Sequence, residues 1–180
     1  MNDERNNILD EWLVMQAQDG DMKAFSILIK RWHPKMLSHA YRMTKDSEVA
    51  KDIAQESWKV ITAKLGKLKS PRAFKVWVYR IINNKSADWI KTRQKEREMI
   101  SDNQVIESDD DNLAGVDNIR RALNELPPEN KLVLTMFYVD CHSVREISQI
   151  LNLSEGTVKS RLFYSRKKLK EKFENINSEL

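Results

Sequence analysis

Apolar residues recur along the chain at spacings of three and four, which is the period of an amphipathic helix. Glycine and proline each occur only four times, too rarely for an architecture of many short strands and turns. The pattern therefore predicts an all-α fold. The helices expected in the first half of the chain span residues 22–43, 47–65 and 71–96.

Capping residues are expected to set the limits of these helices. Asp46 is expected to cap the helix at 47–65. Ser70 is expected to cap the helix at 71–96, because the proline that follows it suits the first helical position. Within the first helix, His33 and Pro34 predict a kink or a restart, since the residue before a proline is pushed out of the helical region.

The last third of the chain predicts a helix, a short turn and another helix. Ser143 and Glu146 form a capping-box pattern, in which each side chain satisfies a backbone N–H of the other residue. The helix that they start is expected to end at a turn of residues 152–154, after which Ser154 caps the final helix. Two further helices are expected before it, at residues 119–126 and 129–139.

Charge and composition divide the chain into two parts. The net charge from Lys, Arg, Asp and Glu is +7 over residues 1–96, −6 over residues 97–118 and +3 over residues 119–180. The acidic connector has few large apolar residues, so it cannot offset its ordering entropy and is expected to be a flexible linker. We expect an N-terminal segment at 1–20, a helical domain at 21–96, the linker at 97–118 and a second helical domain at 119–176.

The final helix is expected to present a nucleic-acid surface. With residues about 100° apart, Val158, Leu162 and Leu169 share the side that faces the core. The other side and its flanks combine hydroxyls, aromatic rings and cations, which suit base edges surrounded by phosphate contacts. These residues are Thr157, Lys159, Ser160, Arg161, Phe163, Tyr164 and Lys167. The alternative is a solvated basic helix, on which two adjacent exposed aromatic residues are unusual.

The helix after Pro71 is a second candidate for nucleic-acid binding. Its apolar stripe is expected at Phe74, Trp77, Val78, Ile81 and Ile82. The face opposite is expected to carry Arg72, Lys75, Tyr79, Asn83 and Ser86. Rings, amides and cations together suit single-stranded nucleic acid, whose bases stack on rings while cations meet its phosphates. The alternative is an ordinary core helix whose tryptophans are buried.

Carboxylates and an amide recur on one side of the helix expected at residues 47–65. Asp52, Gln55, Glu56 and Lys59 lie at spacings of three and four. An acidic patch on a basic domain repels DNA, so it favours a protein partner with basic residues. A solvated helix face is the alternative interpretation.

Several classes of function have no support in the sequence. No apolar run reaches the roughly 18 residues needed to cross a bilayer, and the N-terminus is too acidic for a signal peptide, so a cytoplasmic protein without membrane insertion is expected. The three histidines and the single cysteine do not match metal-ligand spacing. Because phosphate-binding and catalytic motifs are also absent, we expect no metal, no cofactor and no enzymatic activity.

Four motifs follow one another along residues 21–173. They are DIAQESW at 52–58, FKVWVYRIINNKSADWI at 74–90, LNELPPENKLVLTMFYVD at 123–140 and EGTVKSRLFYSRKKL at 155–169. In this order they resemble the motifs of the bacterial RNA polymerase sigma factors of the extracytoplasmic-function (ECF) type, a subfamily of the sigma-70 family. The chain departs from the family at Trp58, where phenylalanine is usual, and at Ile82 and Asn83, where alanine and arginine are frequent.

The resemblance implies a sigma domain two and a helix-turn-helix sigma domain four. Domain two would dock on the clamp helices of the polymerase β′ subunit through Asp52, Gln55 and Glu56. It would also bind and melt the −10 element through the loop at 66–70 and through Arg72, Tyr79, Arg80, Asn83 and Asn84. Domain four would read the −35 element through the final helix. The other partners implied are the polymerase β flap and an anti-sigma factor.

Two other functions stay open from the residues themselves. A stand-alone helix-turn-helix regulator, whose first domain senses a ligand or dimerises, would bind a specific duplex tightly without polymerase. An adaptor that binds only protein would leave the basic final helix without a role. Two nucleic-acid surfaces and a separate acidic patch favour the sigma factor over both.

Overall fold

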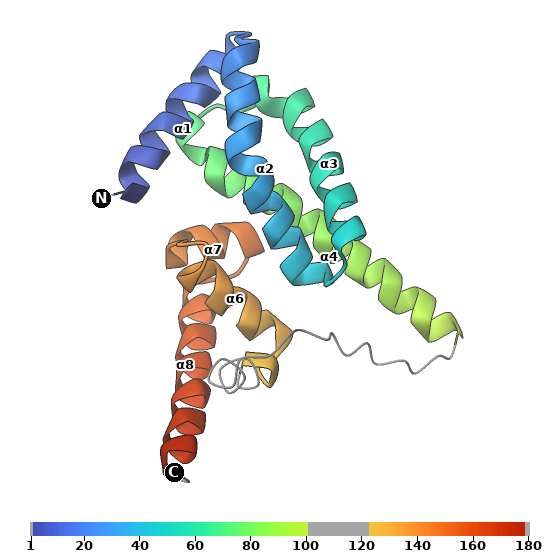
Figure 1. Cartoon of the computed structure of the whole chain (residues 1–180), viewed down its shortest axis with the longest axis vertical. Coiled ribbons are helices and arrows are strands. Elements are labelled where there is room, and N and C mark those ends of the chain that lie inside the picture. The colour runs from blue at the N-terminus through green and yellow to red at the C-terminus, as the bar shows by residue number, and fades with distance from the viewer. Residues whose placement is uncertain (1, 101–122, 179–180) are drawn as a thin grey trace. The chain divides into compact units, whose positions relative to one another are not determined.

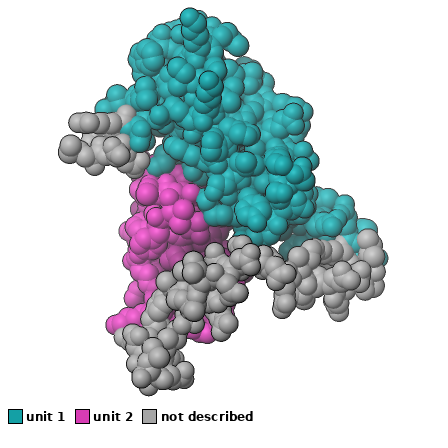
Figure 2. Space-filling model, viewed as in Figure 1, with its two compact units in different colours: residues 1–105 teal, residues 106–180 magenta. Residues whose placement is uncertain are grey.

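The computed structural model describes the backbone of residues 2–100 and 123–178, and the regular structure in this part of the chain is helical throughout. The all-α prediction is therefore confirmed. The chain divides into two compact units, Met1–Val105 (unit 1) and Ile106–Leu180 (unit 2), coloured separately in Figure 2. Most of the predicted linker, from residue 101 onward, lies outside the described residues. No helix in the described ranges is long and apolar enough to cross a bilayer.

Unit 1 is a bundle in which α2 packs against the other long helices (Figure 1). Its elements are α1 (Asn2–Gln18), α2 (Met22–Thr44), α3 (Ser47–Lys64), the 3-10 turns η1 (Leu65–Lys67) and η2 (Pro71–Ala73), and α4 (Phe74–Ile100). α1 forms in the N-terminal segment, for which the sequence pattern predicts no helix. α4 continues through the first residues of the expected linker.

The caps of unit 1 agree in part with the prediction. The Asp46 carboxylate accepts hydrogen bonds from the backbone N–H groups of Glu48 and Val49 at 3.0 and 3.1 Å, so its predicted capping role is confirmed. Ser70 has extended backbone geometry, but its side chain makes no capping hydrogen bond to any described residue. Pro71 opens the 3-10 turn η2 instead, and α4 begins only at Phe74.

Pro34 does not restart α2, so the restart, one of the two expected outcomes, is wrong. The helix runs continuously from Met22 to Thr44 with Pro34 inside it. Proline removes one helical hydrogen bond at a cost of about 3 kcal/mol. Trp32 and Met36 are buried on either side of the exposed Pro34. Their burial holds the helix together across the proline.

Aromatic residues form the centre of the unit 1 core. Trp32 meets Phe74 edge to face with ring centroids 5.3 Å apart, and it also meets Tyr79 at 6.1 Å. The ring of His39 packs edge to face on Tyr79 at 5.2 Å. These contacts join α2 to α4, and such pairs stabilise a core beyond the area that they bury.

Buried apolar side chains and an ion pair hold α1 against α2. Leu13 and Val14 are fully buried. Asp10 is also buried, and its carboxylate accepts a hydrogen bond from Arg31 Nε on α2 at 2.7 Å. Because this pair is largely shielded from water, it holds α1 in place more firmly than a surface pair would.

Unit 2 consists of α6 (Pro128–Tyr138), α7 (Val144–Leu151) and α8 (Glu155–Ser178) within the described residues (Figure 1). α8 packs against both other helices. The core side chains are Val133, Met136, Ile147, Ile150, Val158 and Leu162. The capping box of Ser143 and Glu146 is present as predicted.

The turn between α7 and α8 also matches its prediction. Asn152 ends α7 in the left-handed conformation with a φ of 54°. Ser154 Oγ accepts a hydrogen bond from the backbone N–H of Thr157 at 3.0 Å and so caps α8. α7, the turn and α8 form a helix-turn-helix.

Candidate functional site

The outward face of α8 carries the residues predicted to contact duplex DNA. Val158 and Leu162 are buried and Leu169 is half-buried, so the predicted core side is correct. Phe163 and Tyr164 are 62% and 64% exposed, and their rings meet edge to face at 5.8 Å. Lys159, Ser160 and Lys167 are exposed on the same face, and Thr157 and Arg161 are half-buried at its edges. This face of α8 is available to a macromolecular partner.

Some cations of α8 are engaged within unit 2 instead. Arg166 donates its Nε–H to the Tyr138 hydroxyl at 2.8 Å and lies over the ring of that tyrosine. Lys168 donates to the backbone carbonyl of Glu125 at 2.9 Å. Lys172 forms an ion pair with the Glu125 carboxylate, and this hydrogen bond lowers the pKa of Glu125. These three cations are therefore less available to a phosphate than the lysines of the outward face.

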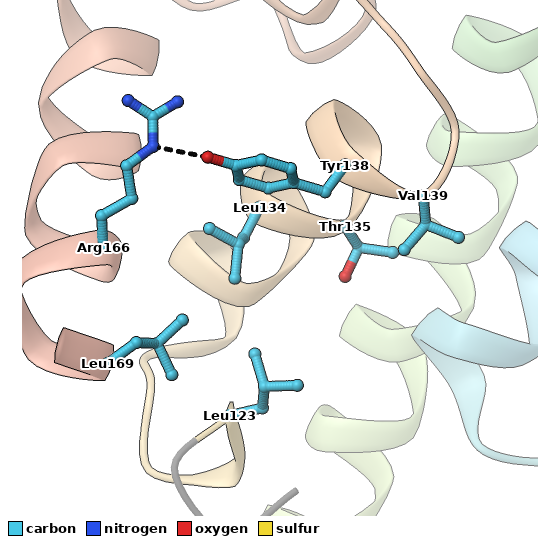
Figure 3. A pocket seen from close by; sticks show the side chains of 7 residues that line it. All are labelled: Leu123, Leu134, Thr135, Tyr138, Val139, Arg166 and Leu169. Atoms are coloured by element: carbon cyan, nitrogen blue, oxygen red, sulfur yellow. Dashed lines mark hydrogen bonds between the residues drawn. The ribbon is translucent and has the colours of Figure 1, made fainter. Parts of the chain in front are cut away.

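A cavity of about 380 Å³ lies between α6 and α8 (Figure 3). The hydrogen bond between Arg166 and Tyr138 crosses one edge of it. Tyr138 and Val139 are 57% and 64% exposed, so apolar surface continues from the cavity to solvent. The lining residues are Leu123, Leu134, Thr135, Tyr138, Val139, Arg166 and Leu169. Apolar surface of this kind is typical of a site for a protein partner.

Three residues of the predicted nucleic-acid face of α4 are buried. Tyr79, Asn83 and Ser86 are 4%, 8% and 0% exposed, so the prediction that they face solvent is wrong. α4 packs against α2 and α3 and also touches α1 and η2, so its buried sector is wider than one apolar stripe. Trp77, which the pattern assigned to the stripe, is only half-buried.

The solvent side of α4 carries a different set of polar residues. Arg80 and Asn84, both predicted for the −10 element, are exposed. Residues at spacings of three and four extend this side with two further cations and a carboxylate. We call the whole set the α4 polar face, and it comprises Arg80, Asn84, Asp88, Lys91 and Lys95. Its last three members were missed by the sequence analysis, although their spacing from Arg80 is helical.

The loop between α3 and α4, residues 66–70, is mostly exposed and carries Lys67 and Lys69. Arg72 follows in η2, with 83% of its side chain exposed. Its Nε lies 3.2 Å from Oε2 of Glu11 on α1. Such an exposed pair contributes little to stability, so Arg72 can exchange the carboxylate for a phosphate.

Asp52, Gln55 and Glu56 are exposed on α3, as predicted, and we call them the α3 patch. Lys59 donates to the Glu56 carboxylate at 2.5 Å, and this hydrogen bond lowers the pKa of Glu56. Glu48 pairs in the same way with Lys51 at 2.6 Å. Because Lys59 lies beside the patch and pairs with Glu56, the patch is less negative than its carboxylates alone imply.

The histidines and the cysteine do not match metal-ligand spacing in the sequence, and their surroundings in the structure differ. His39 and His142 are buried, whereas Cys141 is exposed in the turn after α6. Among the described residues, no three His, Cys, Asp or Glu side chains are grouped closely enough to hold a metal ion.

Two family models match the chain in consecutive segments. The model for Sigma-70 region 2 matches residues 28–96, which cover most of α2 and reach into α4. The model for Sigma-70, region 4 matches residues 117–169, which include α6, α7 and much of α8. α1 precedes both matched segments.

Relatives and solved structures match nearly the whole chain. The ECF RNA polymerase sigma-E factor of Salmonella typhimurium is 29% identical over 94% of this chain and 96% of its own length. The ECF sigma factor SigW of Bacillus subtilis is 26% identical over 91% of this chain and 96% of its own length.

Two solved complexes have a similar fold. In the first, the sigma factor RpoE is bound to the anti-sigma factor NepR from Bartonella quintana. It has a TM-score of 0.71 and 22% identity, over 85% of this chain and 98% of the matched one. In the second, CnrH is bound to the cytosolic domain of CnrY. This structure has a TM-score of 0.68 and 22% identity, over 93% of this chain and 98% of the matched one.

Proposed function

The chain belongs to the sigma-70 family of RNA polymerase sigma factors, in the ECF subfamily, and we propose that its two units read the two elements of a promoter. Region 2 of the family falls on unit 1 and region 4 on unit 2. The chain acts as a specificity subunit, and the chemistry of RNA synthesis belongs to the core polymerase. Because its partners are polymerase and promoter DNA, its place of action is the bacterial cytoplasm.

Unit 2 binds the −35 duplex through the outward face of α8. An α-helix fits the major groove, and the second helix of a helix-turn-helix presents its N-terminal half to the base edges. Ser160, Phe163 and Tyr164 contact bases, while Lys159 and Lys167 contact phosphates at the groove edges. Thr157 and Arg161 lie at the margin of the contact. The exposure of two adjacent aromatic rings on this face is the observation that carries the proposal.

Unit 1 binds the −10 element as a melted strand. The loop at 66–70 and Arg72 supply cations and exposed backbone at one end of α4, and Arg80 and Asn84 supply a cation and an amide along it. Such groups suit the phosphates and unpaired base edges of a single strand. Tyr79 and Asn83 do not contact DNA in this assignment. They pack α4 on its neighbours and so orient the α4 polar face.

The α3 patch docks the chain on the clamp helices of the polymerase β′ subunit. Gln55→Ala combined with Glu56→Lys is expected to weaken binding to purified core about tenfold or more, because hydrogen bonds to charged groups contribute about 1.5 to 3 kcal/mol. Glu96→Lys is the matched control, since Glu96 is also an exposed, ion-paired glutamate but lies on α4. Unchanged core affinity in the double variant would remove the patch from the mechanism.

The cavity between α6 and α8 accepts the polymerase β flap. It is apolar and it opens beside the exposed Tyr138 and Val139. The residues of α8 that line it, Arg166 and Leu169, are not among those of the outward face. An apolar side chain from a partner can therefore enter it while the outward face of α8 holds DNA.

An anti-sigma factor is a further partner. Two similar solved structures are complexes, of RpoE with the anti-sigma factor NepR and of CnrH with the cytosolic domain of CnrY. We extend this mode of regulation to the present chain. A partner that covers the α3 patch or the cavity would block polymerase docking.

Run-off transcription with purified core polymerase and a promoter library tests the whole proposal. Two sequence blocks separated by a constant spacer should be enriched, and only when both the chain and core are present. The stand-alone regulator is not favoured, because the chain carries region 2 as well as region 4. Specific duplex binding by the chain alone, at nanomolar affinity and physiological salt, would favour it again.

A further inference from the structure

A side chain of α1 donates hydrogen bonds to the backbone at the start of the loop that we assign to the −10 strand. The amide nitrogen Nε2 of Gln18, the last residue of α1, donates to the backbone carbonyl of Leu65 at 2.9 Å and to that of Leu68 at 2.8 Å. The two acceptors are about fifty residues away in sequence. Only a donor can face two carbonyl oxygens, so the nitrogen of this amide, and not its oxygen, must point to the loop.

The helix that donates these hydrogen bonds, α1, is packed firmly on the rest of unit 1. Leu13 and Val14 bury the inner face of α1, and Asp10 pairs with Arg31 on α2 at 2.7 Å. Gln18 therefore extends from a helix that is fixed to the body of unit 1. Its amide can hold the loop in one position because it does not move independently of that body.

The loop that accepts these hydrogen bonds has few restraints of its own. Leu65 is buried, and the backbone N–H of Leu68 donates to the Leu65 carbonyl at 3.0 Å. Beyond this turn, Lys67, Lys69 and Ser70 are exposed. Since Ser70 does not cap the helix that follows, the Gln18 amide is a principal side-chain restraint on the loop.

α1 also reaches the far end of the loop. Glu11, seven residues before Gln18 and so on the same side of the helix, pairs with Arg72 at 3.2 Å. One side of α1 thus contacts the chain at both ends of the loop, but the restraint comes from the Gln18 amide, because the exposed Glu11–Arg72 pair contributes little to stability. The residues that do so precede the segment matched by the region 2 family model, which begins at residue 28.

We propose that Gln18 is a positioning residue for promoter recognition, which holds the loop at 66–70 in the conformation that receives the −10 strand. This rests on the assignment of that loop to the −10 element. Ordering the loop before DNA arrives removes an entropic cost from binding and fixes which base edges its backbone and side chains can meet.

Substitutions at Gln18 test the proposal in the full chain with core polymerase. Gln18→Met keeps the length of the side chain but removes the donor, Gln18→Glu places acceptors against two carbonyls, and Gln18→Lys keeps a donor. Gln16→Met is the matched control on the same helix, since Gln16 is also half-buried but no hydrogen bond to its side chain is described. Run-off transcription from promoters that differ only in the −10 or only in the −35 element measures discrimination at each.

Gln18→Met and Gln18→Glu are expected to lower −10 discrimination about two- to thirteenfold, the range given by losing a net hydrogen-bond contribution of about 0.5 to 1.5 kcal/mol. Discrimination at −35 and affinity for core should not change, and Gln18→Lys should recover most of the loss. Hydrogen exchange should accelerate at the amides of residues 66–70 in the Met variant and not in Gln16→Met.

Two outcomes would overturn the inference while leaving the function of the loop intact. One is an unchanged −10 discrimination in Gln18→Met when Lys67→Ala with Lys69→Ala lowers it. The other is an equal loss at −10 and −35, which indicates general destabilisation. If the double lysine variant itself leaves −10 discrimination unchanged, the assignment of the loop fails, and the role of Gln18 fails with it.

Discussion

α4 and α8 are both long helices with basic, aromatic and amide side chains, but they lie in different surroundings. α8 packs on α6 and α7 and leaves Phe163 and Tyr164 in solvent. α4 packs on α2 and α3 and touches α1 and η2, so Tyr79 and Asn83 are buried beside its apolar stripe. The pattern of polar residues along a helix therefore does not by itself show which of them are exposed, because the number and placement of the neighbouring helices decide how wide the buried sector is.

The buried hydroxyls show how such a core tolerates polar residues. Ser86 and Ser57 each donate to the carbonyl four residues earlier, at 2.9 and 2.7 Å. Ser165 does the same on α8 at 2.7 Å. A serine satisfied within its own helix can occupy a core position without a partner on another helix. Asn83 differs, because its buried Oδ1 has no hydrogen-bond partner in the described structure.

The largest effect is expected from truncating a buried aromatic residue of α4, which tests whether that side of the helix belongs to the core. Tyr79→Ala is expected to lower the free energy of unfolding of unit 1 by about 3 to 5 kcal/mol, because it removes a ring that packs on Trp32 and His39. Chemical denaturation followed by circular dichroism measures the change. Arg80→Ala, on the exposed side of the same helix, should stay within about 0.5 kcal/mol of wild type.

A second variant covers the case in which Tyr79→Ala does not fold. Tyr79→Phe keeps the ring and is expected to cost about 1 kcal/mol or less. If Tyr79→Ala instead folds with wild-type stability and changes only the −10 preference, Tyr79 is a contact to DNA and the burial argument is wrong.

The corresponding test on α8 is Ser160→Ala or Tyr164→Ala. Each is expected to change discrimination at one position of the −35 element by about 1 to 3 kcal/mol if the side chain contacts a base edge directly. Stability should change by less than about 0.5 kcal/mol, since both residues are exposed. Selection from a randomised −35 library gives the first quantity and denaturation the second. A loss that is uniform across sequences would make these residues backbone contacts.

Asn83 provides the smallest expected effect. Asn83→Leu has a similar shape and removes a buried acceptor that lacks a partner, so it should leave the free energy of unfolding unchanged or raise it by up to about 1 kcal/mol. Thermal and chemical denaturation measure it. A loss of more than about 2 kcal/mol would indicate that the Asn83 amide makes a contact on which unit 1 depends.

Local patterns in the sequence predict unit 2 well for a physical reason. The capping box at Ser143, the turn at 152–154 and the core side of α8 all depend on residues within four positions of one another. α8 has its packing partners on one side, so a single apolar stripe describes it. The same procedure gives the wrong face for Tyr79 because the neighbours of α4 come from three other helices.

Features that depend on distant residues could not be predicted in this way. The hydrogen bonds from Gln18 to Leu65 and Leu68 and the pair between Glu11 and Arg72 join segments about fifty to sixty residues apart. The pairing of Arg166 with Tyr138 and of Lys172 with Glu125 likewise joins α8 to residues 28 and 47 positions earlier in the chain. No spacing rule within one helix contains these contacts.

The division of promoter reading between the two units is tested most directly by one library experiment. Run-off transcription with core polymerase is performed on promoters randomised at both elements, using wild type, Arg80→Ala and Ser160→Ala. Our account predicts that Arg80→Ala changes base preferences only in the downstream block and Ser160→Ala only in the upstream block, with the spacer unchanged. Altered preferences in the same block for both variants, or an unchanged selection in either, would contradict it.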